Sequence, residues 1–510
     1  MTIRIRVRDK VLACALVALF SVACHLKQIH AADPARPNIV FILADDLGYR
    51  ELGSFGQEKI QTPHLDQLAT QGMRLTQHYC GNAVCAPSRC VLMTGQHPGH
   101  THVRDNSEMQ PDGQKPIPDA TITLAELLKA QGYATGAFGK WGLGGPGSEG
   151  EPLRQGFDRF FGYNCQRHAH SYYPDYLWSD DKRISLGDTP PIPGHAKLAE
   201  GADPSNPRSY DRFKGQEYAP DRIREEALNF IDQHKAEPFF LYYPSVLPHV
   251  ALHVPDAELQ PYSDLQWIDP PFTAAKGGYT PHFTPRAAYA AMISHLDSDV
   301  GAVLQRLKDQ GLEESTIVIF SSDNGTTHLE QEVDYDFFKS VGELRGLKGS
   351  LYEGGVRVPT IVRWPGHVAA GSTNDYVSGF EDWTPTLLNA IGAAAQIPST
   401  TDGVSLMPVL RGMDQPQRPF LYREFPSYGG QQTIRVGDWK AVRQGMARGN
   451  IDVELYNIAT DVSEQHDVAD QHKDVVEQLT KLMAEQHQPS REFPLRPFDQ
   501  PALNNRAGKK

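Results

Sequence analysis

The sequence predicts an α/β fold: a large central, mostly parallel sheet sandwiched by helices, followed by a smaller C-terminal α+β subdomain that contains a short antiparallel sheet. Nearly continuous apolar runs of strand length recur along the chain, as in strands buried on both faces, and segments with helical spacing lie between them. That alternation is typical of helices covering both faces of a sheet. After residue 410 the apolar segments become short and alternating, which indicates antiparallel strands.

The strands and helices of the large domain are predicted from the arrangement of their apolar residues. The expected strands are Asn38–Ala44, Phe239–Tyr243 and Thr316–Phe320, and the expected helices are Thr123–Gln131 and Pro285–Gln310. Two long segments are rich in Pro, Tyr, Asp and His and lack periodic apolar residues, namely Gly162–Tyr218 and Val254–Pro285. Loops of this length inside a domain usually carry function or are disordered.

The C-terminal subdomain and the chain ends complete the domain assignment. The expected elements there are strands within Phe420–Phe425, Thr433–Arg443 and Val453–Ile458 and a helix at Lys473–Gln486, whose apolar stripe should face the core. The tail from Phe493 is expected to be loose. We therefore predict a signal peptide at 1–31, a catalytic domain at 32–410, the α+β subdomain at 411–490 and a tail at 491–510.

The first 31 residues have the pattern of a secretory signal peptide. Four basic residues precede an apolar stretch from Val11 to Ala23, and cleavage is expected after Ala31. The run Ser21-Val22-Ala23-Cys24 loosely resembles a lipoprotein box and is the alternative processing site. Because the apolar stretch is shorter than the ~20 residues of a membrane span, we expect a periplasmic or extracellular protein that is not an integral membrane protein.

Charge and cysteine content restrict the partners. The formal net charge of −13 argues against a protein that coats nucleic acid. The cysteines beyond the leader are Cys80, Cys85, Cys90 and Cys165. In an exported protein four cysteines can form two disulfides, and the sequence leaves their pairing open.

Acidic residues follow two of the expected strands. Asp45-Asp46 comes directly after Asn38–Ala44, and Asp323-Asn324 comes shortly after Thr316–Phe320. Ligand sites of open α/β sheets collect at the carboxyl ends of strands. Carboxylate and amide oxygens suit a hard cation, Ca²⁺ or Mg²⁺, so a metal site is one interpretation. The alternative is that these residues are strand-end caps and turn formers.

Cys85 stands where a helix is expected to begin. Pro87 suits the first turn of a helix, and Gly95 can end it. At a helix amino end the dipole favours an anion or a nucleophile, and Arg89 faces the same side one turn later. The alternative is that Cys85 packs as a small hydrophobic residue.

The run Cys85-Ala86-Pro87-Ser88-Arg89, followed by Leu92-Met93-Thr94-Gly95, resembles the signature of the sulfatase family, in which the cysteine is oxidised to Cα-formylglycine by a formylglycine-generating enzyme. Further blocks resemble the family in order and spacing between about Asn38 and Pro365. They are Asp45-Asp46, Gly139-Lys140-Trp141, Pro248-His249, Asp323-Asn324-Gly325, and Gly346-Leu347-Lys348 followed by Tyr352-Glu353-Gly354-Gly355. The resemblance implies an alkaline-phosphatase-like fold and the hydrolysis of sulfate esters.

The resemblance also implies a role for each site residue. The implied ligands of one divalent cation, calcium with magnesium as the alternative, are Asp45, Asp46, Cys85 as formylglycine, Asp323 and Asn324. The hydrated aldehyde would attack sulfur through one hydroxyl and expel sulfate through the other. Arg89 would hold this hydrate, and Lys140 and Lys348 would bind sulfate oxygens. His249 would hydrogen-bond the sulfate or donate a proton to the leaving group.

One position departs from the family pattern. The family commonly shows Gly-Lys-Trp-His-Leu-Gly, whereas this chain has Gly139-Lys140-Trp141-Gly142-Leu143-Gly144. The histidine that normally contacts the formylglycine hydroxyl is therefore absent at Gly142. His328 or a water molecule is expected to take its place.

An acidic enzyme needs local basic groups to bind a sulfated substrate, because long-range repulsion is screened by salt. The expected substrate-binding residues are His102, Arg104, His168, His170 and Arg345. Aromatic residues beside two of these histidines suit a sugar ring, so we expect a sulfated carbohydrate as substrate. The alternatives are small aryl sulfates, a phosphatase or phosphodiesterase of the same superfamily, or a calcium-stabilised sugar-binding protein with unmodified Cys85.

Overall fold

A ten-stranded sheet forms the centre of the structure, a computed structural model that describes residues 36–187 and 190–499. Its strands are β1 (Asn38–Ala44), β2 (Met73–Leu75), β6 (Ala134–Lys140), β7 (Arg159–Tyr163), β8 (Tyr176–Ser179), β9 (Lys182–Ser185), β10 (Phe239–Pro244), β11 (Thr316–Ser322), β12 (Thr360–Arg363) and β13 (Ser372–Asn374). The strand order is β13-β2-β12-β11-β1-β10-β6-β7-β8-β9. The five strands from β11 to β7 run parallel, and antiparallel pairs flank them on both sides. The predicted mostly parallel sheet is confirmed.

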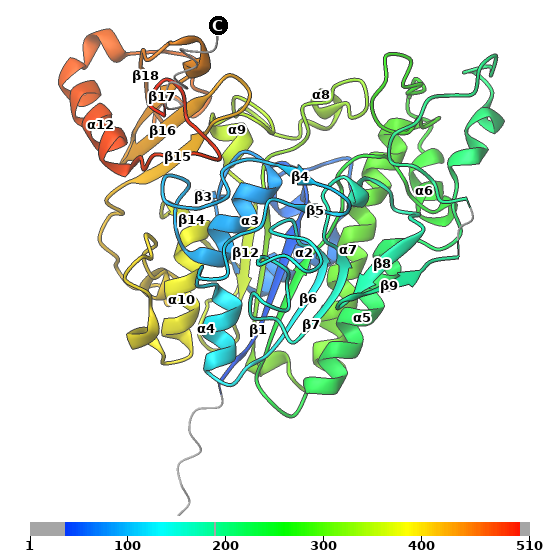
Figure 1. Cartoon of the computed structure of the whole chain (residues 1–510), viewed down its shortest axis with the longest axis horizontal. Helices are drawn as coiled ribbons and strands as arrows, with labels where there is room; N and C mark the ends of the chain where they lie inside the picture. Colours follow the sequence, from blue (N-terminus) through cyan, green and yellow to red (C-terminus); the bar gives the residue numbers. More distant parts are fainter. Residues whose placement is uncertain (1–35, 188–189, 500–510) are drawn as a thin grey trace, which may run out of the picture. The chain divides into compact units, whose positions relative to one another are not determined.

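Helices cover both faces of this sheet (Figure 1). One face packs against α2 (Pro63–Gln71), α5 (Ala219–His234) and α7 (Pro285–Asp309), and the other against α3 (Cys85–Thr94), α4 (Leu124–Ala130) and α10 (Trp383–Ala390). The remaining elements of this part are α6 (Asp256–Ser263), α8 (Tyr335–Phe338), α9 (Glu353–Val356), α11 (Met407–Leu410) and the short pairs β3 (His78–Tyr79) with β14 (Ser378–Gly379) and β4 (Glu108–Met109) with β5 (Gly113–Gln114).

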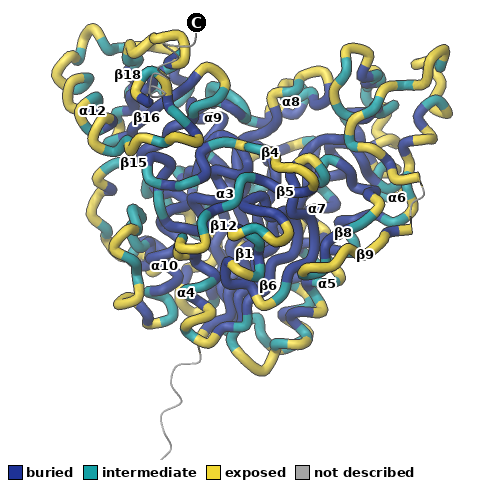
Figure 2. Tube along the Cα trace, in the orientation of Figure 1, coloured by how far each residue is buried: buried dark blue, intermediate teal, exposed yellow. Residues whose placement is uncertain are grey.

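The central strand β1 shows why the apolar runs are continuous. Val40 and Ile42 belong to the core on one face, and Phe41 and Leu43 belong to the core on the other. All four are fully buried, and the central strands are the most buried part of the chain (Figure 2). A strand covered on both faces has no position at which a polar side chain reaches water.

The C-terminal segment forms a separate small antiparallel sheet with one helix. Its elements are β15 (Leu421–Phe425), β16 (Gln431–Val436), β17 (Trp439–Arg443), β18 (Glu454–Asn457) and α12 (Lys473–Gln486). Leu479 and Met483 of α12 are buried against Ile434 and Leu455 of the sheet, so the predicted apolar stripe is core. The alternating segment expected at 433–443 contains two strands, β16 and β17, which form a hairpin that turns at Gly437, where φ is +57°.

The structure refines the expectations for the two irregular segments and the tail, and one expectation, the signal peptide, lies outside the described residues. The segment Gly162–Tyr218 contains the β8–β9 hairpin, which extends the main sheet, and Val254–Pro285 contains α6. The tail is not loose throughout, because Phe493 and Leu495 are buried. The predicted signal peptide and residues 500–510 lie outside the described residues. Within the described ranges, no helix is both long and apolar enough to cross a membrane.

Candidate active site

The carboxyl ends of β1 and β11 bring the acidic residues together. The two strands pair in parallel with Ala44 beside Ser322, so Asp45 and Asp323 leave the sheet side by side. The Asp46 backbone N–H donates to Asp323 Oδ1 at 3.1 Å, and Asn324 Nδ2 donates to Asp46 Oδ1 at 2.7 Å. Asp46 adopts a left-handed backbone with a φ of +68°, a conformation that costs a non-glycine residue about 1–2 kcal/mol and is typical of functional sites.

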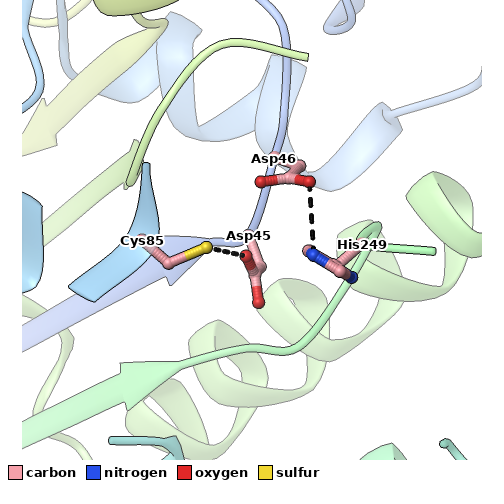
Figure 3. A group of neighbouring side chains, drawn as sticks. All are labelled: Asp45, Asp46, Cys85 and His249. Carbon is pink, nitrogen blue, oxygen red and sulfur yellow. Dashed lines mark hydrogen bonds and ion pairs between the residues drawn. The ribbon is translucent and has the colours of Figure 1, made fainter. Parts of the chain in front are cut away.

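Cys85 is the first residue of α3 and points into this acidic cluster (Figure 3). Its Sγ lies 3.4 Å from Asp45 Oδ1, and the residue is 1% exposed. Burial and the negative charge of Asp45 raise the pKa of the Cys85 thiol above its ordinary value. The unmodified side chain is therefore a protonated thiol at neutral pH, which is a weak nucleophile.

Two lysines place their ammonium groups within 4 Å of the cysteine sulfur. Lys140, the last residue of β6, has its Nζ 2.6 Å from Asp45 Oδ2 and 3.6 Å from Cys85 Sγ. Lys348, in the loop before α9, has its Nζ 2.7 Å from Asp46 Oδ2 and 3.7 Å from the same sulfur. Burial alone would lower the pKa of Lys348, but the neighbouring acidic groups, Asp46 first among them, together outweigh it and hold that pKa well above the ordinary value.

Arg89 fixes the acidic side chains from one turn further along α3. Its Nε and Nη2 donate to Asp323 Oδ2 at 3.1 and 2.8 Å, and Nη2 lies 3.5 Å from Asp45 Oδ2. Burial and the charge of Asp45 raise the pKa of Asp323 to about 6 although Arg89 opposes this shift. The carboxylates therefore repel one another even with the guanidinium present, and an added cation would relieve that repulsion.

His249, which follows β10, faces the same cluster (Figure 3). Its Nε2 lies 3.6 Å from Asp46 Oδ2, and its Nδ1 hydrogen-bonds the carbonyl of Val250. Because a carbonyl only accepts, Nδ1 carries the proton and Nε2 is the free nitrogen of the neutral ring. Burial and the charges of Lys348 and Lys140 hold the pKa of His249 well below its ordinary value.

The donor set fits a hard divalent cation. Asn324 Oδ1 is buried and has no hydrogen-bond partner among the described residues. One ligand atom from each of Asp45, Asp46, Cys85 and His249 lies within 4.8 Å of the others. Carboxylate and amide oxygens are the ligands that Ca²⁺ and Mg²⁺ prefer, and a cation would give the unpartnered Asn324 oxygen its partner.

A cavity of about 530 Å³ opens beside Cys85. Most of its lining side chains are polar. They come from loops after the main-sheet strands, from the segment that runs from α3 to β5, and from the turn between β15 and β16. The lining residues used below are Asp105, Asn106, Gln114, Gln166, His170, Tyr279, His328 and Tyr428. The His170 ring stacks on His249 with ring centroids 4.9 Å apart. His328, expected as a substitute for the missing histidine, lies in the cavity wall against Tyr428.

Of the expected substrate-binding residues, only His170 lines this cavity; the structure places the other four elsewhere. The side chains of these four residues contact other residues of the protein through ring packing, ion pairs or hydrogen bonds. His168 packs on Tyr176, His102 pairs with Glu492 at 3.0 Å, Arg104 pairs with Glu424 at 2.6 Å, and Arg345 stacks on Tyr352 and donates to Tyr456 at 3.0 Å. Arg104 is buried, and the structure does not bring it to this cavity.

Several residues of the cavity are ones that the sequence did not single out. Gln166 and Tyr279 lie within the two irregular segments flagged for function, which is the signal that could have found them. Asn106 and Gln114 are neutral polar loop residues and carry no such signal. Cys80, Cys85, Cys90 and Cys165 are all buried free thiols, so the two possible disulfides do not form among the described residues.

The fold and this site define a hydrolase of the alkaline-phosphatase-like architecture, and the comparisons with known proteins name its family. Residues 37–393 match the Sulfatase family, and residues 347–489 match the C-terminal region of N-sulphoglucosamine sulphohydrolase. The chain belongs to the sulfatase family and is a sulfuric ester hydrolase.

Relatives of known activity cover most of the chain. Arylsulfatase A of Bos taurus is 36% identical over 423 residues, covering 81% of this chain and 75% of that protein. An N-acetylgalactosamine-6-O-sulfatase of Bacteroides thetaiotaomicron is 29% identical over 505 residues, covering 88% of this chain and 92% of its own. A crystal structure of Ps i-CgsB in complex with k-i-k-neocarrahexaose is 26% identical, covers 89% of this chain and 94% of its own, and superposes with a TM-score of 0.72.

Proposed function

We propose that this sulfatase hydrolyses sulfate esters of carbohydrates, with a formylglycine made from Cys85 as nucleophile and one calcium ion as cofactor. The observation that carries the proposal is the position of the Cys85 sulfur, which lies 3.4 Å from Asp45 Oδ1 and 3.6 and 3.7 Å from the ammonium nitrogens of Lys140 and Lys348. The sulfur atom stands in for the hydroxyl oxygens of the hydrated aldehyde. The proposal includes maturation by a formylglycine-generating enzyme.

The state of Cys85 favours the modification. Its thiol is protonated at neutral pH, and a thiol adduct with sulfur would still have to be cleaved by water. A formylglycine hydrate supplies one hydroxyl for attack and a second for release of sulfate, which divides a difficult hydrolysis into two easier steps.

The charge balance favours a divalent cation. Asp45, Asp46 and Asp323 face Arg89 and the two lysines, so formal charges cancel before any ion is added. A cation held by the three carboxylates and the oxygen of Asn324 would leave the site with a net positive charge, which attracts an anionic ester. When bound, it would polarise a sulfate oxygen and lower the pKa of the attacking hydroxyl.

The protein's own side chains bind the sulfuryl group and handle the proton. Lys140 and Lys348 are placed to donate charged hydrogen bonds to sulfuryl oxygens, which carry more charge in the transition state. Arg89 donates a hydrogen bond to Asp323 and so holds this carboxylate in its position within the acidic cluster. His249 Nε2 is the free ring nitrogen beside the cluster, so it is the atom that can accept the proton lost by the attacking hydroxyl and pass that proton to the leaving alkoxide.

The cavity wall supports a carbohydrate over a small aryl group. Asp105, Asn106 and Gln114 offer donors and acceptors for sugar hydroxyls, and Tyr279 and Tyr428 offer aromatic faces. Two of the similar proteins are an N-acetylgalactosamine-6-O-sulfatase and an enzyme crystallised with neocarrahexaose. The similarity to arylsulfatase A favours aryl sulfates as the second candidate substrate.

Substrate competition tests the proposal. Purified enzyme is assayed with sulfated mono- and oligosaccharides, with 4-nitrophenyl sulfate and with 4-nitrophenyl phosphate. We expect kcat/KM to be highest for a sulfated sugar and lowest for the phosphate ester; a preference for phosphate would contradict the proposal. We also propose export, supported by the leader sequence, and N-terminal sequencing of protein from the periplasm or medium should begin at Ala32.

A further inference from the structure

Gln166 is a buried polar side chain whose hydrogen bonds the protein does not satisfy. The residue is 5% exposed, and both its Oε1 and its Nε2 are buried without a partner among the described residues. An unpaired buried polar group costs about 1–3 kcal/mol, so native proteins keep few of them without a reason. A ligand that completes these bonds is such a reason.

The position of Gln166 identifies the ligand's site. Strand β7 pairs with β6 so that Tyr163 lies beside Lys140, and Gln166 follows three residues later at the same carboxyl end. Gln166 lines the cavity together with Cys85, Lys348 and His249. Its unpaired amide is therefore buried next to the space in which the sulfate ester must lie for attack at residue 85.

Gly142 makes room for this amide. Gly142 has a φ of +82°, and a Cβ atom added there would lie 2.6 Å from Gln166 Nε2. Real Cβ atoms do not approach a heavy atom this closely. A side chain at position 142 would therefore strain the backbone and push the Gln166 amide away from its present position, so Gly142 and this placement of Gln166 fit together.

We propose that Gln166 binds the reacting sulfate ester: its amide N–H donates to a sulfuryl oxygen, and its carbonyl accepts from a hydroxyl of the hydrated residue 85. This inference rests on the proposed formylglycine function. A carboxamide has donors and an acceptor, as the two partners require, and it does not ionise. Gln166 therefore adds directional hydrogen bonds to the charges of Lys140 and Lys348 and contributes no titration of its own.

Two substitutions of similar size test the proposal. Gln166→Met removes both hydrogen-bonding groups and should lower kcat/KM by about 10–100-fold, with a similar rise in the inhibition constant of inorganic sulfate. Its Tm should be equal to or above that of the wild type, because an unpaired buried amide is replaced by an apolar side chain. Gln166→Glu should lower kcat/KM further, since a carboxylate repels the sulfate.

Gln57→Met is the matched control. Gln57 is also buried, but its Nε2 donates to the carbonyls of Arg50 and Phe338 at 3.1 and 3.0 Å, and its Oε1 accepts from the Lys59 N–H at 2.9 Å. We expect a lower Tm and an unchanged kcat/KM for this variant, because Gln57 does not line the cavity.

The formylglycine content of every variant is measured by mass spectrometry. An unconverted Cys85 in active wild-type enzyme would overturn the proposed function itself. A fully converted Gln166→Met enzyme with wild-type kcat/KM and sulfate inhibition, or with a lowered Tm and unchanged kinetics, would overturn the role of Gln166 alone.

Discussion

Replacing Lys348 by methionine removes one ammonium group from the reaction centre and keeps most of the side chain's length. In the structure this group lies 2.7 Å from Asp46 and 3.7 Å from the Cys85 sulfur. It is therefore near enough to contact both the acidic cluster and a sulfuryl group bound at residue 85. The variant should fold, because Asp46 keeps its hydrogen bond from Asn324.

The size of the effect follows from that position. Removing one preorganised donor to a developing anion typically lowers kcat by about 10²–10³-fold, or ~2.7–4 kcal/mol. Because Asp46 and the other neighbouring acidic groups hold the pKa of Lys348 well above its ordinary value, the ammonium stays charged and the ratio of wild-type to variant kcat should be constant between about pH 6 and 9.

The assay compares kcat, KM and Tm of the wild type, Lys348→Met and a control, Lys440→Met. Lys440 is also buried between carboxylates, 2.8 Å from Glu353 and 2.9 Å from Glu464, but it lies outside the cavity. Its loss should cost about 3–5 kcal/mol of stability and leave kcat of the folded enzyme unchanged. A Lys348→Met enzyme whose kcat stays within roughly threefold of the wild type would refute the assigned role.

Three further predictions test other parts of the account. Treatment with EGTA should lower both Tm and turnover because it removes the calcium ion proposed at the carboxylates, and added calcium should restore both; unchanged values after complete chelation argue against the ion. Arg104→Met should lower stability by about 3–5 kcal/mol through the loss of its buried pair with Glu424 and leave KM unchanged, and a raised KM with normal Tm would return Arg104 to the substrate site. Burial alone would lower the pKa of His295, but Asp299 and Asp221 raise this pKa to about 10. The positive charge of His295 therefore stabilises the fold fully below about pH 6.5, and this contribution is lost as the pH rises towards 10. In urea unfolding, His295→Gln should be less stable than the wild type by on the order of 4 kcal/mol near pH 6 and by little at pH 10, and a difference that does not change with pH contradicts the shift.

The buried strands and long helices could be predicted from the sequence because their surroundings leave a simple pattern. Strand β1 has both observed ends at the expected residues, and α12 does also. Both elements bury apolar side chains at regular positions, so the order and spacing of apolar residues in the sequence mark where each element begins and ends. The hairpin of β16 and β17 was missed because its two-residue turn barely interrupts the alternating pattern.

The site residues likewise fall into those that the sequence could place and those that only the structure could place. Asp45 and Asp323 directly follow strands and Lys140 ends one, so topology places all three at one edge of the sheet. Arg104 could not be placed, because its carboxylate partner Glu424 lies 320 residues away in the chain. Gln166 has no charge and no periodic neighbours, and its importance appears only when its burial and lack of partners are known.

Mass spectrometry of the tryptic peptide of residues 75–89 from active, natively expressed enzyme tests the central claim most directly. The account predicts that the side chain at position 85 has lost the mass of a thiol and gained that of an aldehyde or its hydrate, and that Cys80 in the same peptide keeps its thiol. An intact Cys85 thiol, or a disulfide between Cys80 and Cys85, in fully active protein would contradict the account.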